Sequence, residues 1–313
     1  MSIVIPTRNR PKLLLRALLS ILSQGINNVE VVIVDSSDGK YKLLNTKIIK
    51  SLRMYQIEFK HVYIPPTSPS KARNVGIYHS QGEYIAFLDD DDYWLPNKLL
   101  TQLRLIKNGY NFIATGCVIM LDEPRRRKVK GIRIPKIMNP YEDILKTNFI
   151  ATSTVVVKKY LLLKAGCFNE ELYNLEDWDC WIRLLKLPDT RFHLIPAPLV
   201  VISHYPYYST GKSKRLSESI LKFLMYHLKE LDKDTVPLLL LRAYEHLIVE
   251  AQRSKDLERI IYSLRPKSLL LRIRIAIHRI LLYPKLSSLL RILWLVNDRS
   301  YGFIQRLISL LII

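Results

Sequence analysis

Cysteine is scarce in this chain, with three residues among 313. Cys117, Cys167 and Cys180 are odd in number and lie far apart in the sequence. This pattern argues against a disulfide framework, which is indicated by an even and denser set of cysteines, and against a zinc site, whose ligands are closely spaced. We therefore expect reduced thiols and a cytoplasmic location.

Two kinds of hydrophobic segment are also missing. No basic leader with a small-residue cleavage site precedes the apolar residues 2–6, so no secretory signal is expected. No uncharged apolar run approaches the ~20 residues that a membrane-spanning helix needs. We predict no transmembrane span, so that any attachment to the cytoplasmic face of a membrane would be peripheral.

Acidic residues are outnumbered, with 28 Asp and Glu against 48 Lys and Arg, which gives a formal net charge of +20. A basic excess of this size indicates an anionic partner, which is a nucleotide, a nucleic acid or an acidic membrane surface. The chain is 49% hydrophobic and 24% charged, which is typical of a globular protein with a sizeable core.

Apolar runs alternate with helical patterns through the first two thirds of the chain. We predict strands at 2–6, 29–35, 58–64, 84–88, 111–121, 152–159 and 191–203, the last interrupted by proline. We predict helices at 11–24, 40–53, 96–108 and 176–186, a short helix between 66 and 84, and a basic loop at 122–131. This alternation favours an α/β fold with an open, mostly parallel sheet flanked by helices.

Strand signals stop near residue 213, and the remaining sequence is typical of consecutive helices. We place a domain boundary near 210, with an α/β domain at 1–210 and a helical, basic region at 211–313. Residues 265–313 carry nine Lys and Arg against the single acid Asp298. Two interpretations are about equally supported: an amphipathic anchor on an anionic membrane, or a helical subdomain that packs its apolar faces within the protein.

Four consecutive aspartates, Asp89 to Asp92, follow the apolar strand at 84–88. At about 6 Å and an effective dielectric constant near 20, each neighbouring pair repels by roughly 2 to 3 kcal/mol. A solvated acidic turn is the simplest interpretation of such a run. The preceding buried strand and the sheltering Tyr93 and Trp94 instead favour a bound cation, and carboxylates suit Mg²⁺ or Mn²⁺.

Basic residues precede this acidic run, with Lys71 and Arg73 on the short helix that leads into the strand. They are either ordinary surface charges of a helix or contacts to a diphosphate held by the cation. In open α/β sheets, ligands bind beyond the carboxyl ends of the strands. Asp35 and the aspartates at 89–92 both lie at that position, so we expect the ligand there.

Four motifs together resemble glycosyltransferase family 2, the inverting enzymes with the GT-A fold. They are SIVIPTRNR, EVVIVDSSDG, ARNVGIYHSQGEYIAFLDDDD and CFNEELYNLEDWDCWIRL, in the family's order over residues 2–205. The resemblance implies a Rossmann-like GT-A domain, here with a C-terminal helical basic extension. It also implies transfer of a sugar from a nucleotide-diphosphate sugar, UDP-sugar being favoured, to a glycan or lipid-linked acceptor.

The same resemblance implies roles for residues that bind the donor. Pro6, Thr7 and Asn9 look like the start of the nucleotide pocket, and Asp35 resembles the acid that contacts a uracil-type base. Arg73 resembles a contact to the diphosphate or the base.

In the acidic run, Asp89 and Asp91 match the outer positions of the family's D-x-D motif. Asp91 resembles the metal ligand, and Asp89 and Asp90 would face the ribose and the sugar. Which of the four aspartates binds the metal stays open.

Asp177, in EDWD, resembles the general base of the family. An acceptor hydroxyl is a weak nucleophile, so a carboxylate that takes its proton suits the chemistry. Alternatively, Glu176, Asp177 and Asp179 are first-turn acids that offset the helix dipole. His204 occupies a position where the family often has a metal-binding histidine, although a lone histidine is more often structural.

Two other functions compete with glycosyl transfer. A metal-dependent nucleotidyltransferase also uses acidic metal sites, but it would be expected to have a glycine-rich loop where this chain has TRNRPK. A basic nucleic-acid-binding protein fits the charge, but no recognised nucleic-acid module is present and the C-terminal region is rich in leucine. We therefore expect an enzyme with no nucleic-acid partner.

Overall fold

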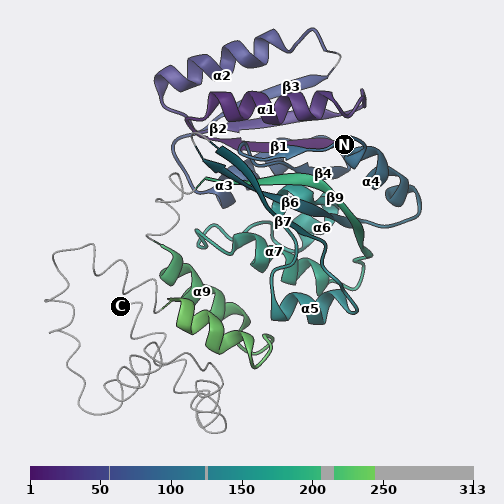
Figure 1. Cartoon of the computed structure of the whole chain (residues 1–313), viewed down its shortest axis with the longest axis vertical. Helices are drawn as coiled ribbons and strands as arrows, with labels where there is room; N and C mark the ends of the chain where they lie inside the picture. Colours follow the sequence, from purple (N-terminus) through teal and green to yellow (C-terminus); the bar gives the residue numbers. More distant parts are fainter. Residues whose placement is uncertain (56, 124–125, 206–214, 244–313) are drawn as a thin grey trace, which may run out of the picture. The chain divides into compact units, whose positions relative to one another are not determined.

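The computed structural model describes residues 1–55, 57–123, 126–205 and 215–243 of the chain (Figure 1). The chain divides into two compact units between Lys212 and Ser213. The predicted basic amphipathic segment at 265–313 lies outside the described residues.

The first unit begins with parallel strands and the helices that connect them. The strands are β1 (Ser2–Thr7), β2 (Glu30–Asp35), β3 (Glu58–Tyr63) and β4 (Tyr84–Phe87), and the helices are α1 (Pro11–Leu22), α2 (Gly39–Ser51) and α3 (Pro69–His79). Proline occupies the first turn of α1 and of α3, where its fixed φ suits a helix and its missing N–H costs nothing. Ser68 caps α3 by accepting a hydrogen bond from the backbone N–H of Lys71.

The second part of this unit extends the same sheet. Its elements are β5 (Tyr93–Trp94), α4 (Lys98–Lys107), β6 (Phe112–Glu123), β7 (Arg126–Arg133), α5 (Pro140–Lys146), the 3₁₀ turn η1 (Thr152–Thr154), β8 (Val156–Lys158), α6 (Lys159–Lys164), α7 (Glu176–Leu185) and β9 (Phe192–His204). The strand order is β3-β2-β1-β4-β8-β6-β9-β5, with β7 paired to β6.

Strand direction determines which residues meet at the edge of this sheet. Strand β8 is antiparallel to both β4 and β6, so β6 runs in the same direction as β4, and β9 is parallel to β6. The carboxyl ends of β1, β2, β4, β6 and β9 therefore point the same way. The predicted α/β fold with a mostly parallel sheet is confirmed.

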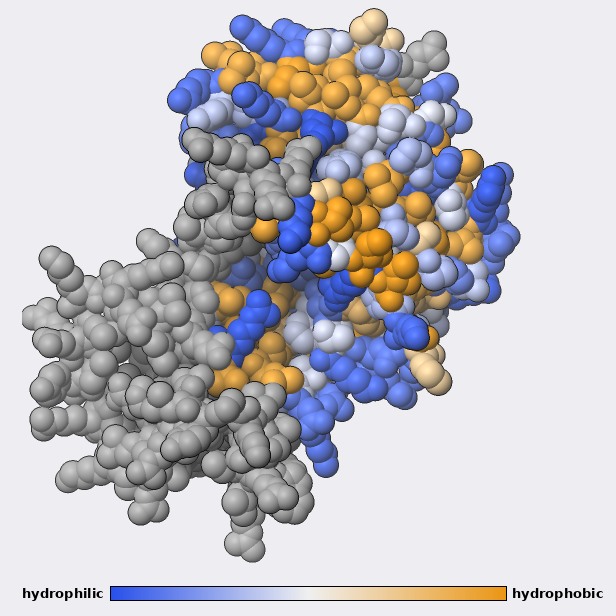
Figure 2. All heavy atoms as spheres, in the orientation of Figure 1, coloured by the Kyte–Doolittle hydropathy of each residue, from blue (hydrophilic) through white to orange (hydrophobic). Residues whose placement is uncertain are grey.

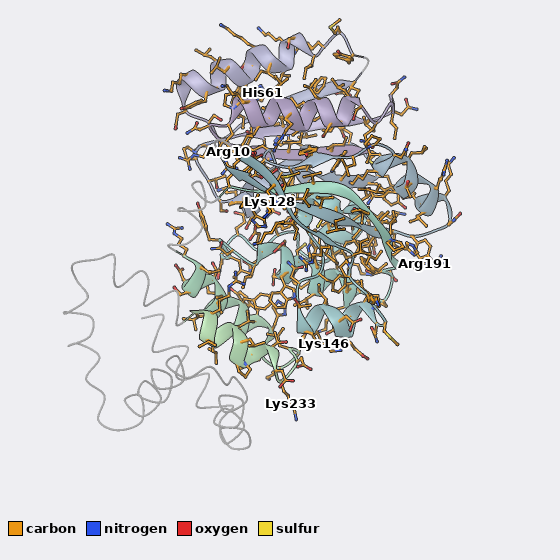
Figure 3. All side chains as sticks on the ribbon, viewed as in Figure 1. Arg10, His61, Lys128, Lys146, Arg191 and Lys233 are labelled. Carbon is orange, nitrogen blue, oxygen red and sulfur yellow. The ribbon has the colours of Figure 1, made fainter. Side chains whose placement is uncertain are left out.

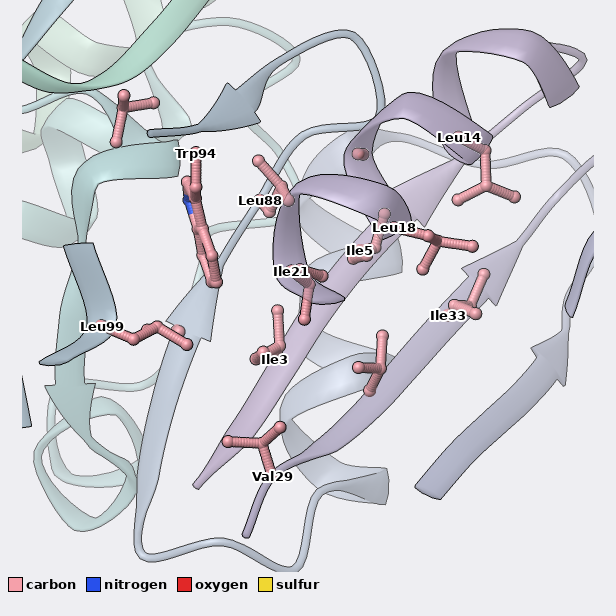
Figure 4. Close-up of a cluster of buried hydrophobic side chains, with 14 of the residues drawn as sticks. Ile3, Ile5, Leu14, Leu18, Ile21, Val29, Ile33, Leu88, Trp94 and Leu99 are labelled. Carbon is pink, nitrogen blue, oxygen red and sulfur yellow. The ribbon is translucent and has the colours of Figure 1, made fainter. Parts of the chain in front are cut away.

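Alternation along β1 and β2 divides the core between the two faces of the sheet. Ile3, Ile5 and Ile33 belong to the cluster that packs under α1, together with Leu14 and Leu18 (Figure 4). Side chains on the opposite face, among them Val32 and Val34, form a second cluster with Ala72 of α3. Helices α1 and α3 thus cover opposite faces of the parallel strands.

Helix α3 approaches the sheet closely at Gly76. A Cβ atom there would lie 2.3 Å from Cγ1 of Val4 and 3.3 Å from Cγ2 of Val34. Only glycine permits this approach. The approach matters for the site because α3 also carries Arg73.

Three predicted elements differ from the structure. The basic loop predicted at 122–131 is wrong, since most of it forms β7, an antiparallel partner of β6. Residues 152–154 of the predicted strand at 152–159 form η1, and the strand is confined to β8. Strand β9 runs through its prolines without a break, and its ladder with β6 shifts register beside Pro198.

In the second unit, the described residues include α9 (Leu216–His227) and a helical stretch at 235–243. Ile220, Phe223 and Leu224 of α9 are buried. Among the residues that the structure describes, no helix is both long enough and apolar enough to cross a membrane.

Candidate active site

The candidate site lies at the carboxyl ends of the parallel strands. Thr7 ends β1 and is in register with Asp35, which ends β2. The backbone N–H of Leu88 bonds to the carbonyl of Val4, which places the acidic run of residues 89–92 beside β1. Arg10, in the loop after β1, pairs with Asp90, and His61, within β3, pairs with Asp35; both basic residues are labelled in Figure 3.

Asp90 is the buried centre of the acidic run. Its Oδ2 accepts a hydrogen bond from the Thr7 hydroxyl at 2.8 Å, and its Oδ1 lies 3.2 Å from Nη1 of Arg10. Burial and repulsion from Asp91 raise the pKa of Asp90 to about 7, against the attraction of Arg10. Thr7 therefore contacts the acidic run directly.

Asp91 is half-buried, and Arg10 holds its carboxylate from one side. Nη1 of Arg10 lies 2.8 Å from Oδ2 of Asp91. Arg10 is not among the residues predicted from the sequence, although its place in the loop after β1 puts it at the edge where ligands bind.

Asp92 is buried and held from two distant segments. The Ser153 hydroxyl donates to Oδ2 at 2.6 Å, and the backbone N–H of Ser203 donates to Oδ1 at 3.0 Å. Burial, with repulsion from Asp91 and Asp89, nevertheless raises the pKa of Asp92 well above its ordinary value. Neither serine has a sequence signal that points to this role.

Three carboxylates of the run form a group suited to a metal ion. One oxygen each of Asp89, Asp91 and Asp92 lies within 4.8 Å of the others. The raised pKa values of Asp90 and Asp92 reflect burial first and repulsion between neighbouring carboxylates second. A divalent cation would relieve the repulsion, and hard oxygen donors suit Mg²⁺ or Mn²⁺. The residues present therefore fit such an ion.

The predicted ligand His204 is not part of that group among the described residues. It is exposed at the end of β9, next to Ser203, whose backbone bonds to Asp92.

Arg73 connects the acidic run to α7. Its Nη2 lies 2.8 Å from Oδ1 of Asp89, and its Nη1 lies 2.9 Å from Oε1 of Glu176. The side chain is 4% exposed, so Arg73 lies beneath the carboxylates. Glu176, which the sequence suggested only as a helix-dipole acid, is thus one partner of a buried ion pair.

Asp177 lies in the first turn of α7. Leu175, the residue before the helix, has φ of +63°, a left-handed conformation that is unfavourable for leucine and that sets the direction of this turn. The carboxylate of Asp177 accepts from Nδ2 of Asn148 at 3.1 Å and from the backbone N–H of Trp178 at 2.7 Å. Burial and the charge of Glu176 raise the pKa of Asp177 to about 6.

Asp35 is fully buried and organises the turn after β2. It accepts hydrogen bonds from the backbone N–H of Ser37, from Asn45 and from His61, with Nε2 of His61 at 3.0 Å. Burial would raise the pKa of Asp35, but these hydrogen bonds outweigh it and lower the pKa. The hydroxyl of Ser37 in turn accepts from the backbone of Asn9 at 2.8 Å.

The predicted nucleotide residues at the end of β1 lie side by side. Pro6 is half-buried and Thr7 is buried, while Asn9 has φ of +58° and bonds through its side chain to Asp38. The structure brings these residues, the acidic run and Asp35 to one edge. Asp177 joins them through Arg73 and Glu176.

Helix α1 adds a second arginine that the sequence motifs do not indicate. Arg16 donates to the backbone carbonyl of Asp91 and, at 3.2 Å, to the hydroxyl of Ser203. It also pairs with Asp122, at the end of β6, at 3.3 Å. Arg16 therefore fixes the acidic run between α1 and the last strands of the sheet.

Residues 2–163 match the model of Glycosyl transferase family 2. The chain is 28% identical over 197 residues to the GalNAc(5)-diNAcBac-PP-undecaprenol beta-1,3-glucosyltransferase of Campylobacter jejuni, covering 62% of each chain. It is 28% identical over 189 residues to the Escherichia coli UDP-Glc:alpha-D-GlcNAc-diphosphoundecaprenol beta-1,3-glucosyltransferase WfgD, covering 59% of this chain and 69% of that protein. An uncharacterized glycosyltransferase of Rickettsia bellii is 30% identical, but the match spans only 26% of that protein.

Solved structures share the fold. S. aureus TarS 1-349 in complex with UDP-GlcNAc has a TM-score of 0.56 at 19% identity, covering 78% of this chain and 71% of that chain. The mannosyltransferase PcManGT from Pyrobaculum calidifontis, in complex with GDP-Man and Mn²⁺, has a TM-score of 0.53 at 16% identity, covering 84% and 78%. At these identities the likeness concerns the fold alone.

The match to the family model covers more than half of the chain. It includes the ends of β1 and β2 and the acidic run at 89–92. Together with the α/β architecture and the glycosyltransferase relatives, it establishes that this chain is a glycosyltransferase of family 2 with the GT-A fold.

Proposed function

We propose that this enzyme is a metal-dependent inverting glycosyltransferase that uses a UDP-sugar and glycosylates a hydroxyl of a lipid-linked glycan. One observation carries the proposal. Buried Arg73 connects Asp89, in a cluster of carboxylates suited to a divalent ion, with the helix turn that bears Asp177. In this proposal one ion-pair network, centred on Arg73, connects the cation site with the carboxylate base.

Asp91, with Asp89 and Asp92, would hold Mn²⁺ or Mg²⁺. Of the three, Asp91 is the residue we assign as the essential ligand, because its carboxylate is half-buried and Asp92 is fixed by two hydrogen bonds. Such an ion stabilises the negative charge of a departing nucleotide diphosphate. In this proposal His204, exposed at the end of β9, would complete the site.

The turn after β1 would contact the nucleotide. In this proposal Pro6, Thr7 and Asn9 line the pocket, and Asp90 with Asp89 faces the ribose and the sugar. The burial of Asp35 supports a role in shaping the turn that bears Asn9, in addition to the proposed contact with the base.

Arg73 has both terminal nitrogens engaged by carboxylates. We propose that it positions Asp89 and α7, in place of the direct diphosphate contact that the family resemblance implies.

Asp177 would act as the general base. As the acceptor oxygen forms its bond to the anomeric carbon, the bond from that carbon to the diphosphate breaks, and the hydroxyl proton passes to the carboxylate of Asp177. A single displacement of this kind inverts the anomeric centre. The raised pKa of Asp177, about 6, makes it a better proton acceptor than an ordinary aspartate while leaving it ionised at neutral pH.

The relatives support the choice of acceptor. The named Campylobacter and Escherichia enzymes act, by their names, on undecaprenol-linked diphosphate glycans. A lipid-linked acceptor is consistent with a cytoplasmic enzyme that associates with the membrane face. We further propose that residues 1–210 form the catalytic domain and that 211–313 form the helical extension.

The test is nucleotide release from a panel of UDP-, GDP- and dTDP-sugars, with Mn²⁺, with Mg²⁺ and with chelator. Detergent-solubilised lipid extract supplies the acceptor. We expect metal-dependent release of UDP by wild type, loss of release in Asp91→Ala, and wild-type behaviour in the control Glu83→Ala, which removes an exposed carboxylate outside the site. Release that is unaffected by chelator and by Asp91→Ala would refute metal dependence. Release of GDP or dTDP alone would refute the UDP-sugar preference.

A further inference from the structure

Strand β7 and the chain that follows it present basic and apolar side chains together. We call residues 128–138 the basic strand surface. Lys128, Lys130 and Lys136 are exposed on it, and no acidic residue occurs from 124 to 141. Aliphatic side chains alternate with the lysines along the chain, with Ile132 62% and Met138 95% exposed. The register with β6 places Lys128, opposite Leu121, on one face of the strand and Val129, opposite Met120, on the other. Blue and orange atoms accordingly lie side by side over the face where β7 runs (Figure 2).

Protection of a sheet edge explains the lysines of this surface, but not its exposed aliphatic residues. Among the described residues β7 pairs with β6 alone, and lysines commonly prevent such an edge from pairing with another chain. Exposed aliphatic residues have the opposite effect, because they favour association. Single exposed aliphatic residues are common on protein surfaces. Val129, Ile132 and Met138, however, lie within ten positions of one another among lysines, a composition that suits a partner both anionic and apolar.

The basic strand surface begins at the catalytic edge of the sheet. Lys128 is in register with Leu121 of β6, and Leu121 is in register with His204 of β9. The next residue of β6, Asp122, pairs with Arg16, which bonds to the backbone carbonyl of Asp91. A partner that covers the lysines would therefore lie next to the strand end that bears Asp122, the partner of Arg16.

We propose that the basic strand surface binds an anionic phospholipid bilayer along the edge of β7 that faces away from β6, so that side chains of both faces of the strand reach it, with the lysines at the headgroups and Ile132 and Met138 in the interfacial layer. Charge complementarity favours this partner, and mixed basic and aliphatic surfaces suit the membrane interface. A nucleic acid fits less well, because residues 128–138 contain no aromatic side chain on which a base could stack. The benefit to catalysis rests on the proposed lipid-linked acceptor, whereas the binding itself does not.

The first experiment measures partition of the full chain onto phosphatidylcholine vesicles with and without phosphatidylglycerol. Each basic residue near an anionic surface contributes about 1 kcal/mol, so Lys128→Gln with Lys130→Gln should weaken partition about thirty-fold. The control pair Lys47→Gln with Lys50→Gln removes the same charge from exposed positions of α2. We expect the control to partition like wild type.

The second experiment reports contact at a single position. All three native cysteines are buried, so an introduced cysteine can be labelled selectively with an environment-sensitive fluorophore. We expect the label at Met138→Cys to shift to the blue on anionic vesicles. The label at Leu43→Cys, 65% exposed on α2, should not shift.

Equal partition of both lysine pairs, together with no shift at Met138→Cys, would overturn the proposal. Loss of RNA binding in Lys128→Gln with Lys130→Gln, without loss of vesicle binding, would also overturn it. Nucleotide release in detergent separates this result from the proposed function, because the lysine variants should release nucleotide as wild type does. Absence of metal-dependent release from every protein, with vesicle binding intact, would instead refute the transferase mechanism.

Discussion

Among single side chains, Asp177 differs from an ordinary aspartate because it is buried and lies beside the carboxylate of Glu176. Burial and that neighbouring charge raise its pKa to about 6. A base must be deprotonated to act, so we expect kcat/KM to rise with pH through a value near 6 and then level off. Measuring kcat/KM from pH 5 to pH 8 at saturating metal tests this. A value of kcat/KM that stays constant over this range, as expected for a base with an ordinary pKa near 4, would contradict it.

Asp177→Asn should remove the proton acceptor and keep the size and shape of the side chain. General-base catalysis contributes about 10² to 10⁴ in rate, so we expect kcat to fall by that factor. Binding of the nucleotide, followed by calorimetry with metal present, should remain at the wild-type level because Asp177 contacts Asn148 and its own helix turn. Loss of nucleotide binding would show that Asp177 acts on the donor.

Arg73 is the buried cation that the two carboxylates on either side of it require. Replacing it by methionine leaves Asp89 and Glu176 without that charge, and breaking a buried pair in this way costs about 3 to 5 kcal/mol. We expect a fall of that size in the free energy of unfolding, measured with denaturant. Arg73→Lys retains the charge and should lose less, although lysine cannot bridge both carboxylates with a planar group. Equal stability of Arg73→Met and wild type would contradict the ion-pair assignment.

Among the helices and strands, the position of α3 depends on Gly76. A methyl group there would collide with Val4, and overpacking of this kind costs about 1 to 3 kcal/mol. We expect Gly76→Ala to lower the melting temperature and, by displacing Arg73, also to lower kcat. Adding Val4→Ala to this variant removes the colliding side chain, so the double variant should regain part of the melting temperature and part of kcat.

Gly39→Ala is the matched control, because nothing lies within 4 Å of the position that a Cβ atom would take at this residue, at the start of α2. Alanine is the better helix former, so this variant should be as stable as wild type or more so. Equal destabilisation by the two substitutions would show that close packing at Gly76 is not the cause.

Elements with strong hydrophobic periodicity can be predicted from the sequence. The pattern at 11–24 predicts a helix, and α1 spans Pro11–Leu22; the run at 29–35 predicts a strand, and β2 spans Glu30–Asp35. Strand β7 could not be predicted, because its consecutive basic residues have little strand preference. Pairing with β6 imposes the strand, and pairing is a property of the tertiary structure.

The candidate site is predictable where strand ends determine it. The acidic run and Asp35 both follow strands, so their common edge can be inferred from the alternating pattern. Ser153 and Ser203 cannot be found in this way, because they reach Asp92 from segments 61 and 111 residues away. Sequence spacing carries no signal for such contacts.

For the protein as a whole, the metal-free enzyme should become less stable as pH rises. The pKa of Asp90 is about 7 in the folded protein, above the ordinary value near 4 for the unfolded chain. The folded state therefore binds this proton more tightly, and the resulting stability is present below pH 4 and is lost between pH 4 and pH 7. The raised pKa of Asp177 acts in the same direction up to about pH 6.

Metal should reverse this trend, because the bound ion compensates the carboxylates. At one hundred times its dissociation constant, a ligand that binds only the folded state adds about 2.7 kcal/mol. Melting curves at pH 5 and pH 8, with Mn²⁺ and with chelator, should show the larger metal effect at pH 8. The same metal effect in Asp91→Ala would place the ion elsewhere.

The hydrogen bond from Ser203 to Asp92 also has a consequence for the order in which the nascent chain matures. Ser203 lies 111 residues after Asp92 in the sequence, so the ribosome adds more than one hundred residues between the two. At about 5 to 20 residues per second, Asp92 waits on the order of ten seconds before that contact is possible. Asp92 lacks both of its donors until Ser153 has been made, 61 residues later, and still lacks the second until Ser203 follows. The catalytic edge is therefore completed late in translation, although its first strand is among the first residues made.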